Sequence, residues 1–309
     1  MTAVAGRLRW LRDKVRRRLV LARLQPARAA AWLGDRRWRT SLNELSEEEL
    51  RRRRRSESVF VFGSGASLNE IAPEGWAEIA RHDTIGFNYF SRQRFVRVDY
   101  HLVGEISTKN DLDRSVWLPA VREYTALIAD NPQYRETILG LQEGWTAFQS
   151  NRLVSERLIP AERGVFRYRR VARGVFSRPS ASLRDGLVHG AGSLISCVNL
   201  AYALGWKEIV LAGVDLYDSR YFWLPESADR DSLQRVHGIG RDDPHPTARA
   251  MLEYLDKWAS LLAPQGVRLA VENPRSLLAD ALPVRSVSRS APATGARGVV
   301  AAAPEPGRG

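Results

Sequence analysis

The sequence is poor in cysteine, in histidine and in long apolar runs. Among its 309 residues are one cysteine, Cys197, and five histidines. A single cysteine excludes an internal disulfide framework and a cysteine-rich zinc site, and is typical of a protein from a reducing compartment. No stretch approaches the roughly 18 consecutive apolar residues of a membrane-spanning helix, and the arginine-rich start lacks the apolar core of a secretory signal. We therefore expect a globular, cytoplasmic protein.

Positive charge is concentrated at the start of the chain. Residues 1–55 hold 17 Lys and Arg against 6 Asp and Glu, so almost all of the net charge of +12 lies in this arm. Leu8, Leu11, Val15 and Leu19 recur at helical spacing among the arginines, as in a helix lying on an anionic membrane surface. The alternatives are a helix packed on the body and a contact with RNA. We favour the membrane surface over nucleic acid, and expect peripheral association with the inner face of the membrane.

Strand and helix patterns alternate through the middle of the chain. Apolar runs predict strands over 58–63, 83–90, 98–104, 207–216 and 267–274, and helices over 193–205 and 245–266. This order predicts an α/β fold, a Rossmann-like parallel sheet with helices on both faces, spanning residues 56–283. Residues 284–309 are rich in Ala, Pro, Gly and Arg without periodicity, which predicts a disordered tail.

A glycine-rich turn follows the first predicted strand. It contains Gly63, Ser64, Gly65 and Ser67. Glycines let a backbone approach a phosphate or ribose closely, and free amides at the next helix start favour an anion. The alternative is a tight turn that holds no ligand, because the spacing matches neither a dinucleotide fingerprint nor a P-loop.

Polar side chains also end two other predicted strands at the same edge. Asn88 follows the second strand, and its amide can read a base or a ribose or simply cap a turn. Asp215, Tyr217 and Tyr221 follow the strand over 207–216. Two tyrosines near a phosphate can donate hydrogen bonds to it without a metal, while the alternative is aromatic packing at the rim.

Two of the five histidines lie in one segment. His245 precedes the predicted helix over 245–266, where a general base above a cleft can be held, and His237 is the alternate. A capping or surface role is the simpler interpretation of a single loop histidine.

In this order, the motifs resemble a known family. The chain resembles the bacterial sialyltransferases of glycosyltransferase family forty-two, which use CMP-sialic acid. The stretches that carry the resemblance are FGSGASLNEI, IGFNYF, GSLISCVNLAYALGWKEIVLAGVDLY, HPTARAMLEYLDK and VRLAVENPRSLLA. The likeness runs from Val59 to Leu282. It implies a GT-A-variant-like fold with a small lid around 108–187, and an inverting transfer that needs no metal or other cofactor.

The resemblance also implies roles for individual residues. Gly63, Gly65 and Ser67 would form the nucleotide turn, with Asn88 and Ser193 contacting the donor. Tyr217 and Tyr221 would stabilise the phosphate of departing CMP, and His245 would deprotonate the acceptor hydroxyl. The partners would then be a CMP-sugar and a glycan acceptor; a homo-oligomer remains open.

The sequence departs from this family where the donor would bind. Ser64 stands where the family has Asn, and Ala66 replaces a proline. His189 precedes the Ser193 motif where an arginine is often found, and Gly104 ends the third strand where the family has an asparagine. The donor sugar can therefore be sialic acid, a related nonulosonic acid or Kdo.

Two other functions remain as hypotheses. The glycine turn and LGWKEIVLAGVDL are also similar to the domain of archaeal pterin diphosphokinases and flagellar accessory factors, where Asp215 and Asp218 would hold magnesium for phosphoryl transfer. The other hypothesis is a nucleotide-binding module without catalysis.

The basic, aromatic stretch 163–176 fits either a contact with an anionic acceptor or, more simply, an exposed lid helix.

Overall fold

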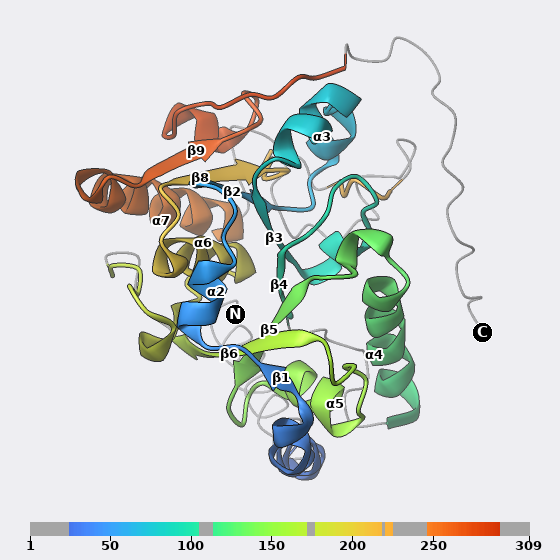
Figure 1. Ribbon diagram of the computed structural model, residues 1–309. Coiled ribbons are helices and arrows are strands. Elements are labelled where there is room, and N and C mark those ends of the chain that lie inside the picture. The colour runs from blue at the N-terminus through green and yellow to red at the C-terminus, as the bar shows by residue number, and fades with distance from the viewer. Residues whose placement is uncertain (1–24, 105–113, 172–176, 218–219, 225–245, 291–309) are drawn as a thin grey trace, which may run out of the picture.

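A parallel sheet of nine strands organises the chain (Figure 1). The computed structural model describes residues 25–104, 114–171, 177–217, 220–224 and 246–290. The strand order is β1-β6-β5-β4-β3-β2-β8-β9, with β7 paired to β6, and all these pairings are parallel. The strands are β1 (Asn43–Glu44), β2 (Ser58–Phe62), β3 (Asp83–Phe87), β4 (Tyr100–Leu102), β5 (Ile138–Glu143), β6 (Gly164–Val171), β7 (Leu187–Val188), β8 (Glu208–Ala212) and β9 (Arg268–Val271).

Helices cover both faces of the sheet. One face carries α6 (Ser193–Leu204) and α7 (Pro246–Leu262). The other carries α3 (Pro73–Ile79), α4 (Arg114–Ala129) and α5 (Phe148–Ser155). The predicted Rossmann-like α/β fold is confirmed.

The central strands are apolar throughout because both of their faces are buried. In β2, Val59 and Val61 belong to the core under α6 and α7, while Phe60 and Phe62 belong to the core under α3 and α4. Continuous apolar runs are expected for parallel strands covered on both sides. The five predicted strands and two predicted helices are therefore present, with their ends one to a few residues away from the predicted ends.

The segment that was expected to hold the lid, 108–187, supplies much of the sheet instead. Its described residues include β5, β6 and β7 as well as α4 and α5. The basic stretch 163–176 was interpreted as an exposed helix, and this is wrong for its first part, since 164–171 is strand β6. The arginines of β6, at 167, 169 and 170, interrupt the apolar run, so that the strand pattern is not evident in the sequence.

Part of the basic arm packs on the domain. A helix spans 25–38, and β1 pairs with β6. In and just after α2 (Glu47–Arg52), Arg51 donates to the carbonyl oxygen of Ala203 at 2.8 Å and Arg54 to that of Gly205 at 2.5 Å. Residues 25–55 thus extend the fold, and the predicted amphipathic helix around Leu8–Leu19 lies outside the described residues.

The start of the expected tail is also anchored. Val284 forms a bridge with Val271, and Arg289 forms one with Ile71. The Arg289 guanidinium also pairs with buried Glu272 at 2.5 Å. Residues 284–290 are therefore ordered against the sheet, and 291–309 are not described.

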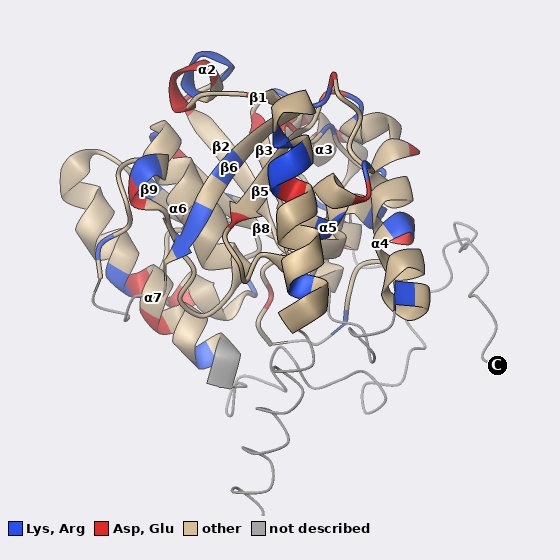
Figure 2. Ribbon diagram, turned by 90° about the horizontal axis from the view of Figure 1, so that it is seen from below, with Lys and Arg blue, Asp and Glu red and all other residues tan. Residues whose placement is uncertain are grey.

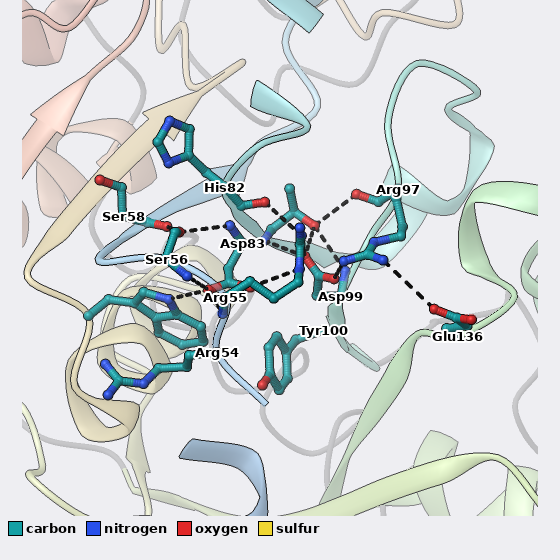
Figure 3. A network of polar contacts seen from close by, with 12 residues as sticks. Arg54, Arg55, Ser56, Ser58, His82, Asp83, Arg97, Asp99, Tyr100 and Glu136 are labelled. Carbon is teal, nitrogen blue, oxygen red and sulfur yellow. Dashed lines mark hydrogen bonds and ion pairs between the residues drawn. The ribbon is translucent and has the colours of Figure 1, made fainter. Parts of the chain in front are cut away.

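Two carboxylates, one buried and one partly buried, bind the amino ends of the central strands (Figure 3). Asp83 is fully buried and accepts hydrogen bonds from the amides of Arg55 and Ser56, at 2.9 and 3.1 Å, and from the indole of Trp206 at 2.9 Å. Asp99 accepts from the Arg55 guanidinium at 2.8 Å. This network closes the edge of the sheet opposite to the candidate site.

Within the described part of the chain, no helix has both the length and the apolar character needed to cross a bilayer.

We expect Asp83→Ala to destabilise the fold strongly, because it leaves the amides of Arg55 and Ser56 and the buried indole of Trp206 without an acceptor. The loss should be about 3 to 5 kcal/mol in the free energy of unfolding, measured by urea denaturation. Glu136→Ala is the matched control, since its side chain is 78% exposed and its ion pair with Arg97 is 3.8 Å long. Equal losses in the two variants would contradict this account of the network.

Candidate functional site

The glycine turn after β2 packs directly against the end of β8. A Cβ atom added to Gly63 would lie 2.3 Å from the carbonyl oxygen of Gly213. One added to Gly65 would lie 2.3 Å from a carboxylate oxygen of Asp215. Both glycines are therefore required by close packing within the protein, whereas the sequence had suggested that they make room for a ligand.

The backbone amides of this turn alternate in direction. Those of Gly63 and Gly65 each donate to a carbonyl oxygen at the end of β8, at 2.8 Å, and that of Ser67 donates to the carboxylate beyond it at 3.0 Å. The Ala66 amide faces the carbonyl oxygen of Arg220 in the bridge between Gly65 and Tyr221, and within the described residues the amide of Ser64 has no acceptor. One amide of the turn is thus left for an anion, which is the part of the phosphate-binding prediction that the geometry supports.

Asp215 stabilises the turn through hydrogen bonds. Its carboxylate is 3% exposed and accepts from the hydroxyl of Ser67 at 2.5 Å and from the side-chain amide of Asn273 at 2.9 Å. Ser67 and Asp215 were both predicted to contact the nucleotide, and the structure bonds them to each other. They position the turn, and Asn273, which the predicted site lacked, completes the group from the end of β9.

Tyr217 belongs to the same group. Its hydroxyl accepts a hydrogen bond from the Asn273 amide at 3.3 Å. Burial of the half-buried ring and the nearby charge of Asp215 raise the pKa of Tyr217. The phenol therefore keeps its proton at neutral pH and can donate it in a hydrogen bond.

Tyr221 is joined to the turn through the backbone. It forms an antiparallel bridge with Gly65, and the amide of Phe222 donates to the carbonyl oxygen of Ser64 at 3.1 Å. The Tyr221 ring stacks on Trp223 with centroids 4.6 Å apart and planes 2° from parallel. Burial raises the pKa of Tyr221 as well, so both tyrosines present neutral phenols. Trp223 was not predicted as a site residue.

Asn88 and Ser193 meet at a second point on this edge. Asn88 has a left-handed backbone with φ of 50°, where Asn is tolerated better than most residues. A Cβ added to Gly104 would lie 1.9 Å from the Asn88 side-chain oxygen and 3.7 Å from the Ser193 hydroxyl. Gly104 was noted in the sequence only as a departure from the family, and it proves to be what lets these two predicted residues approach.

His189 lies just before α6, beside this second point. Its Nδ1 is 3.1 Å from the hydroxyl of Ser196, which itself donates to the carbonyl oxygen of Val188 at 3.2 Å. The hydroxyl therefore accepts from His189, so Nδ1 carries the proton. Burial, with a smaller contribution from Arg170, lowers the pKa of His189 to about 4, which makes the ring neutral at physiological pH.

Three of the residues considered from the sequence lie outside the described part of the chain. They are His245, its alternate His237 and Asp218. Among the residues that the structure describes, no group of three or more His, Cys, Asp or Glu is arranged to hold a metal ion.

Comparison with known proteins identifies distant structural neighbours. No family model matches the chain. No curated protein matches it. Among solved structures, it is 14% identical to Cst-I, a monofunctional alpha-2,3-sialyltransferase from Campylobacter jejuni, over 78% of this chain and 82% of that one, with a TM-score of 0.43.

Two further neighbours are comparably distant. The sialyltransferase CstII from Campylobacter jejuni, in complex with the substrate analogue CMP-3FNeuAc, is 14% identical over 77% of this chain and 93% of that one, with a TM-score of 0.41. The MAf glycosyltransferase from Magnetospirillum magneticum AMB-1 is 19% identical over 76% of this chain and 36% of that one, with a TM-score of 0.43. At TM-scores of 0.41–0.43, what these enzymes bind does not carry over to this chain. The fold assignment rests on the chain's own strand order.

We expect Gly65→Ala to displace the turn, since the new Cβ would overlap the Asp215 carboxylate. Stability should fall by about 1 to 3 kcal/mol, and the affinity for CMP should fall at least about tenfold, because the free amide of Ser64 moves with the turn. Isothermal titration calorimetry measures the second effect. Gly164→Ala is the control, because its Cβ would meet the side chains of Leu45 and Ile138 at 3.2 and 3.4 Å and no backbone atom. Unchanged CMP affinity in Gly65→Ala would exclude the turn as the nucleotide site.

Proposed function

We propose that this protein is an inverting glycosyltransferase that moves sialic acid, a related nonulosonic acid or Kdo from a CMP-activated donor to a hydroxyl of a surface glycan. One observation carries the proposal: the glycine turn, with the free amide of Ser64, is connected to both Tyr217 and Tyr221. The first tyrosine is linked to it through Asn273 and Asp215, and the second through a backbone bridge.

This arrangement suits a departing nucleotide phosphate. When the bond between the anomeric carbon and the phosphate oxygen breaks, negative charge develops on CMP. The amide of Ser64 and the neutral phenols of Tyr217 and Tyr221 are donors that can stabilise that charge. Their arrangement is fixed before the reaction, because buried Asp215 and Asn273 hold the turn.

The other half of the reaction needs a base. The acceptor oxygen attacks the anomeric carbon and gives up its proton, for which we propose His245, with CMP leaving on the opposite side of the sugar. Asn88 and Ser193 would contact the donor, since they meet on the same edge of the sheet. Under this proposal no metal or other cofactor takes part.

A magnesium-dependent phosphotransferase is less well supported. That hypothesis requires Asp215 as a metal ligand, yet its two carboxylate oxygens accept hydrogen bonds from Ser67 and Asn273. Binding a cation there would require these bonds to break. A nucleotide-binding module without catalysis would have the same turn but no dependence on His245.

The basic arm supports a location for the enzyme. Since residues 25–55 pack on the domain, the proposed membrane contact narrows to residues 1–24, with their arginines near the headgroups and Leu8, Leu11 and Trp10 on the apolar side. We propose that this segment associates peripherally with the cytoplasmic face of the membrane, where a glycan acceptor can be reached.

The first experiment is a thermal-shift titration with CMP, CTP, ATP, UDP and GDP, each with and without magnesium. A ligand that binds only the folded state raises the melting temperature. We expect CMP and CTP to stabilise the protein without magnesium. Stabilisation by ATP alone, and only with magnesium, would contradict the glycosyltransferase proposal.

Tyr217→Phe should slow sugar transfer without abolishing CMP binding. Removing one donor to developing charge typically costs about a hundredfold to a thousandfold in turnover. Transfer from CMP-activated sugars, measured by CMP release, tests this. Tyr202→Phe is the control, because this hydroxyl bonds Gln265 on the surface at 2.6 Å. Equal turnover in the two variants would remove Tyr217 from the mechanism.

His245→Ala should abolish transfer while CMP still binds, since the base acts on the acceptor and not on the nucleotide. His237→Ala is the matched variant from the same segment and should retain activity. If His245→Ala turns over normally, the base lies elsewhere; if neither histidine matters and no CMP-sugar is consumed, the module without catalysis is the better description.

A further inference from the structure

A second cavity opens on the carboxyl side of the sheet, away from the glycine turn. Its volume is about 580 Å³, and it lies between the helix over 25–38 and the ends of β5 and β6. The lining residues are Trp32, Asp35, Arg36, Arg39, Gln142, Glu143, Gly144, Thr146, Arg167, Arg169 and Arg170. Figure 2 shows the basic end of β6 in blue.

A buried ion pair builds the wall of this cavity. The Arg167 guanidinium contacts the Asp35 carboxylate through two hydrogen bonds, at 2.7 and 3.1 Å. Both side chains are less than one-tenth exposed, at 3% and 7%. The pair joins the helix over 25–38 to β6, so this wall of the cavity is fixed by a buried interaction.

Positive charge remains in the cavity after its ion pairs are counted. Arg167 is matched by Asp35 and Arg39 by Glu143 at 2.8 Å, and Glu44 contacts both arginines, at 3.1 Å from Arg39 and 3.5 Å from Arg167. Within the described residues, the other three lining arginines have no acidic partner. They are Arg36, whose guanidinium lies 4.9 Å above the Trp32 ring, Arg169, which donates to the carbonyl oxygen of Arg184 at 2.6 Å, and Arg170. A concave site lined by three arginines without an acidic partner suits a compact anion such as a phosphate or a carboxylate.

The cavity shares an edge with the proposed nucleotide site. Between β2 and β5 lie β4 and β3, so the cavity is three to four strand spacings away, about 14 to 19 Å at 4.7–4.9 Å per strand. The proposed nucleotide site lies at the ends of β2, β8 and β9. Ligands of such sheets bind along the carboxyl edge. The remaining length of this edge is where the second substrate of a transfer reaction can lie.

We propose that this cavity binds an anionic group, a phosphate or carboxylate, on the acceptor of the transfer reaction. The inference rests on the proposed function and adds the chemical class of the acceptor. Trp32 supplies an apolar wall beside the guanidinium groups, and sugar phosphates and acidic sugars present both an apolar ring face and a charge. A flat bilayer surface does not enter a concavity, which is why a soluble acidic head is favoured over a lipid layer.

The test compares anionic and neutral ligands by isothermal titration calorimetry on the full chain. Glucose 1-phosphate, glucuronate and pyrophosphate are the probes, with glucose as the uncharged control. We expect saturable binding of at least one sugar-linked anion and none of glucose. Arg36→Ala and Arg170→Ala should each weaken that binding about tenfold to a hundredfold, since each removes a charged donor.

Arg37→Ala is the matched control for Arg36→Ala. Both residues lie on the same helix, are exposed and cover a tryptophan ring, at 4.9 Å for Arg36 over Trp32 and 5.1 Å for Arg37 over Trp38. Only Arg36 lines the cavity. Affinity within twofold of the unsubstituted protein in Arg37→Ala, with loss in Arg36→Ala, supports the cavity. Equal effects in the two variants, or equal binding of glucose, overturn it.

Titration of CMP into the same variants separates this inference from the proposed function. Unchanged CMP affinity in Arg36→Ala and Arg170→Ala, together with lost anion binding, supports two separate sites. If the unsubstituted protein does not bind CMP, the proposed function fails and the acceptor role of the cavity fails with it, even where sugar phosphates bind. The last experiment measures binding to vesicles of anionic phospholipid. If the protein binds vesicles, loses this binding in Arg36→Ala and binds no sugar-linked anion, the cavity would be assigned to a lipid headgroup instead.

Discussion

The buried carboxylate of Asp215 is the constraint on which the carboxyl edge of the sheet depends. It accepts hydrogen bonds from Ser67 in the turn after β2 and from Asn273 after β9, while itself following β8. A buried charge is tolerated only when hydrogen bonds satisfy it, so these three chain segments must keep their positions together. The same group fixes Tyr217 through Asn273 and leaves Gly65 no room for a side chain. One carboxylate thus sets the shape of the turn and the place of a proposed phosphate donor.

The amino edge of the sheet contributes to stability, and the carboxyl edge holds the proposed site. At the amino edge, Asp83 and Asp99 accept hydrogen bonds from donors of the chain itself. At the carboxyl edge, the packing of the glycine turn leaves the amide of Ser64 without an acceptor among the described residues. Polar groups of this kind cost free energy when buried without a partner, so an edge that retains them is suited to binding.

The sequence predicted the central fold well because local patterns suffice there. Strands such as β2 and β8 are apolar on both faces, and α6 ends at Gly205 in a left-handed conformation. β6 was missed for the opposite reason: its arginines resemble a solvated surface, yet Arg167 is buried by a carboxylate 132 residues earlier in the chain. No local periodicity reveals such a pair. The same holds for Asn273, whose role depends on contacts with residues more than fifty positions away.

The glycine turn is conserved in position between the prediction and the structure, but the reason for its glycines differs. Glycines were predicted to admit a ligand, but in the structure they admit Gly213 and Asp215. The turn nevertheless presents the free amide of Ser64 at an edge where Asn88 and Ser193 also lie, because tight packing against β8 fixes which amides are consumed. Gly104 follows β4, and β4 is the neighbour in the sheet of β5, whose end lines the cavity. A donor held at the turn and an anionic acceptor held at the cavity would therefore meet near Gly104, the position where a larger side chain would separate Asn88 from Ser193 and obstruct the approach of one substrate to the other.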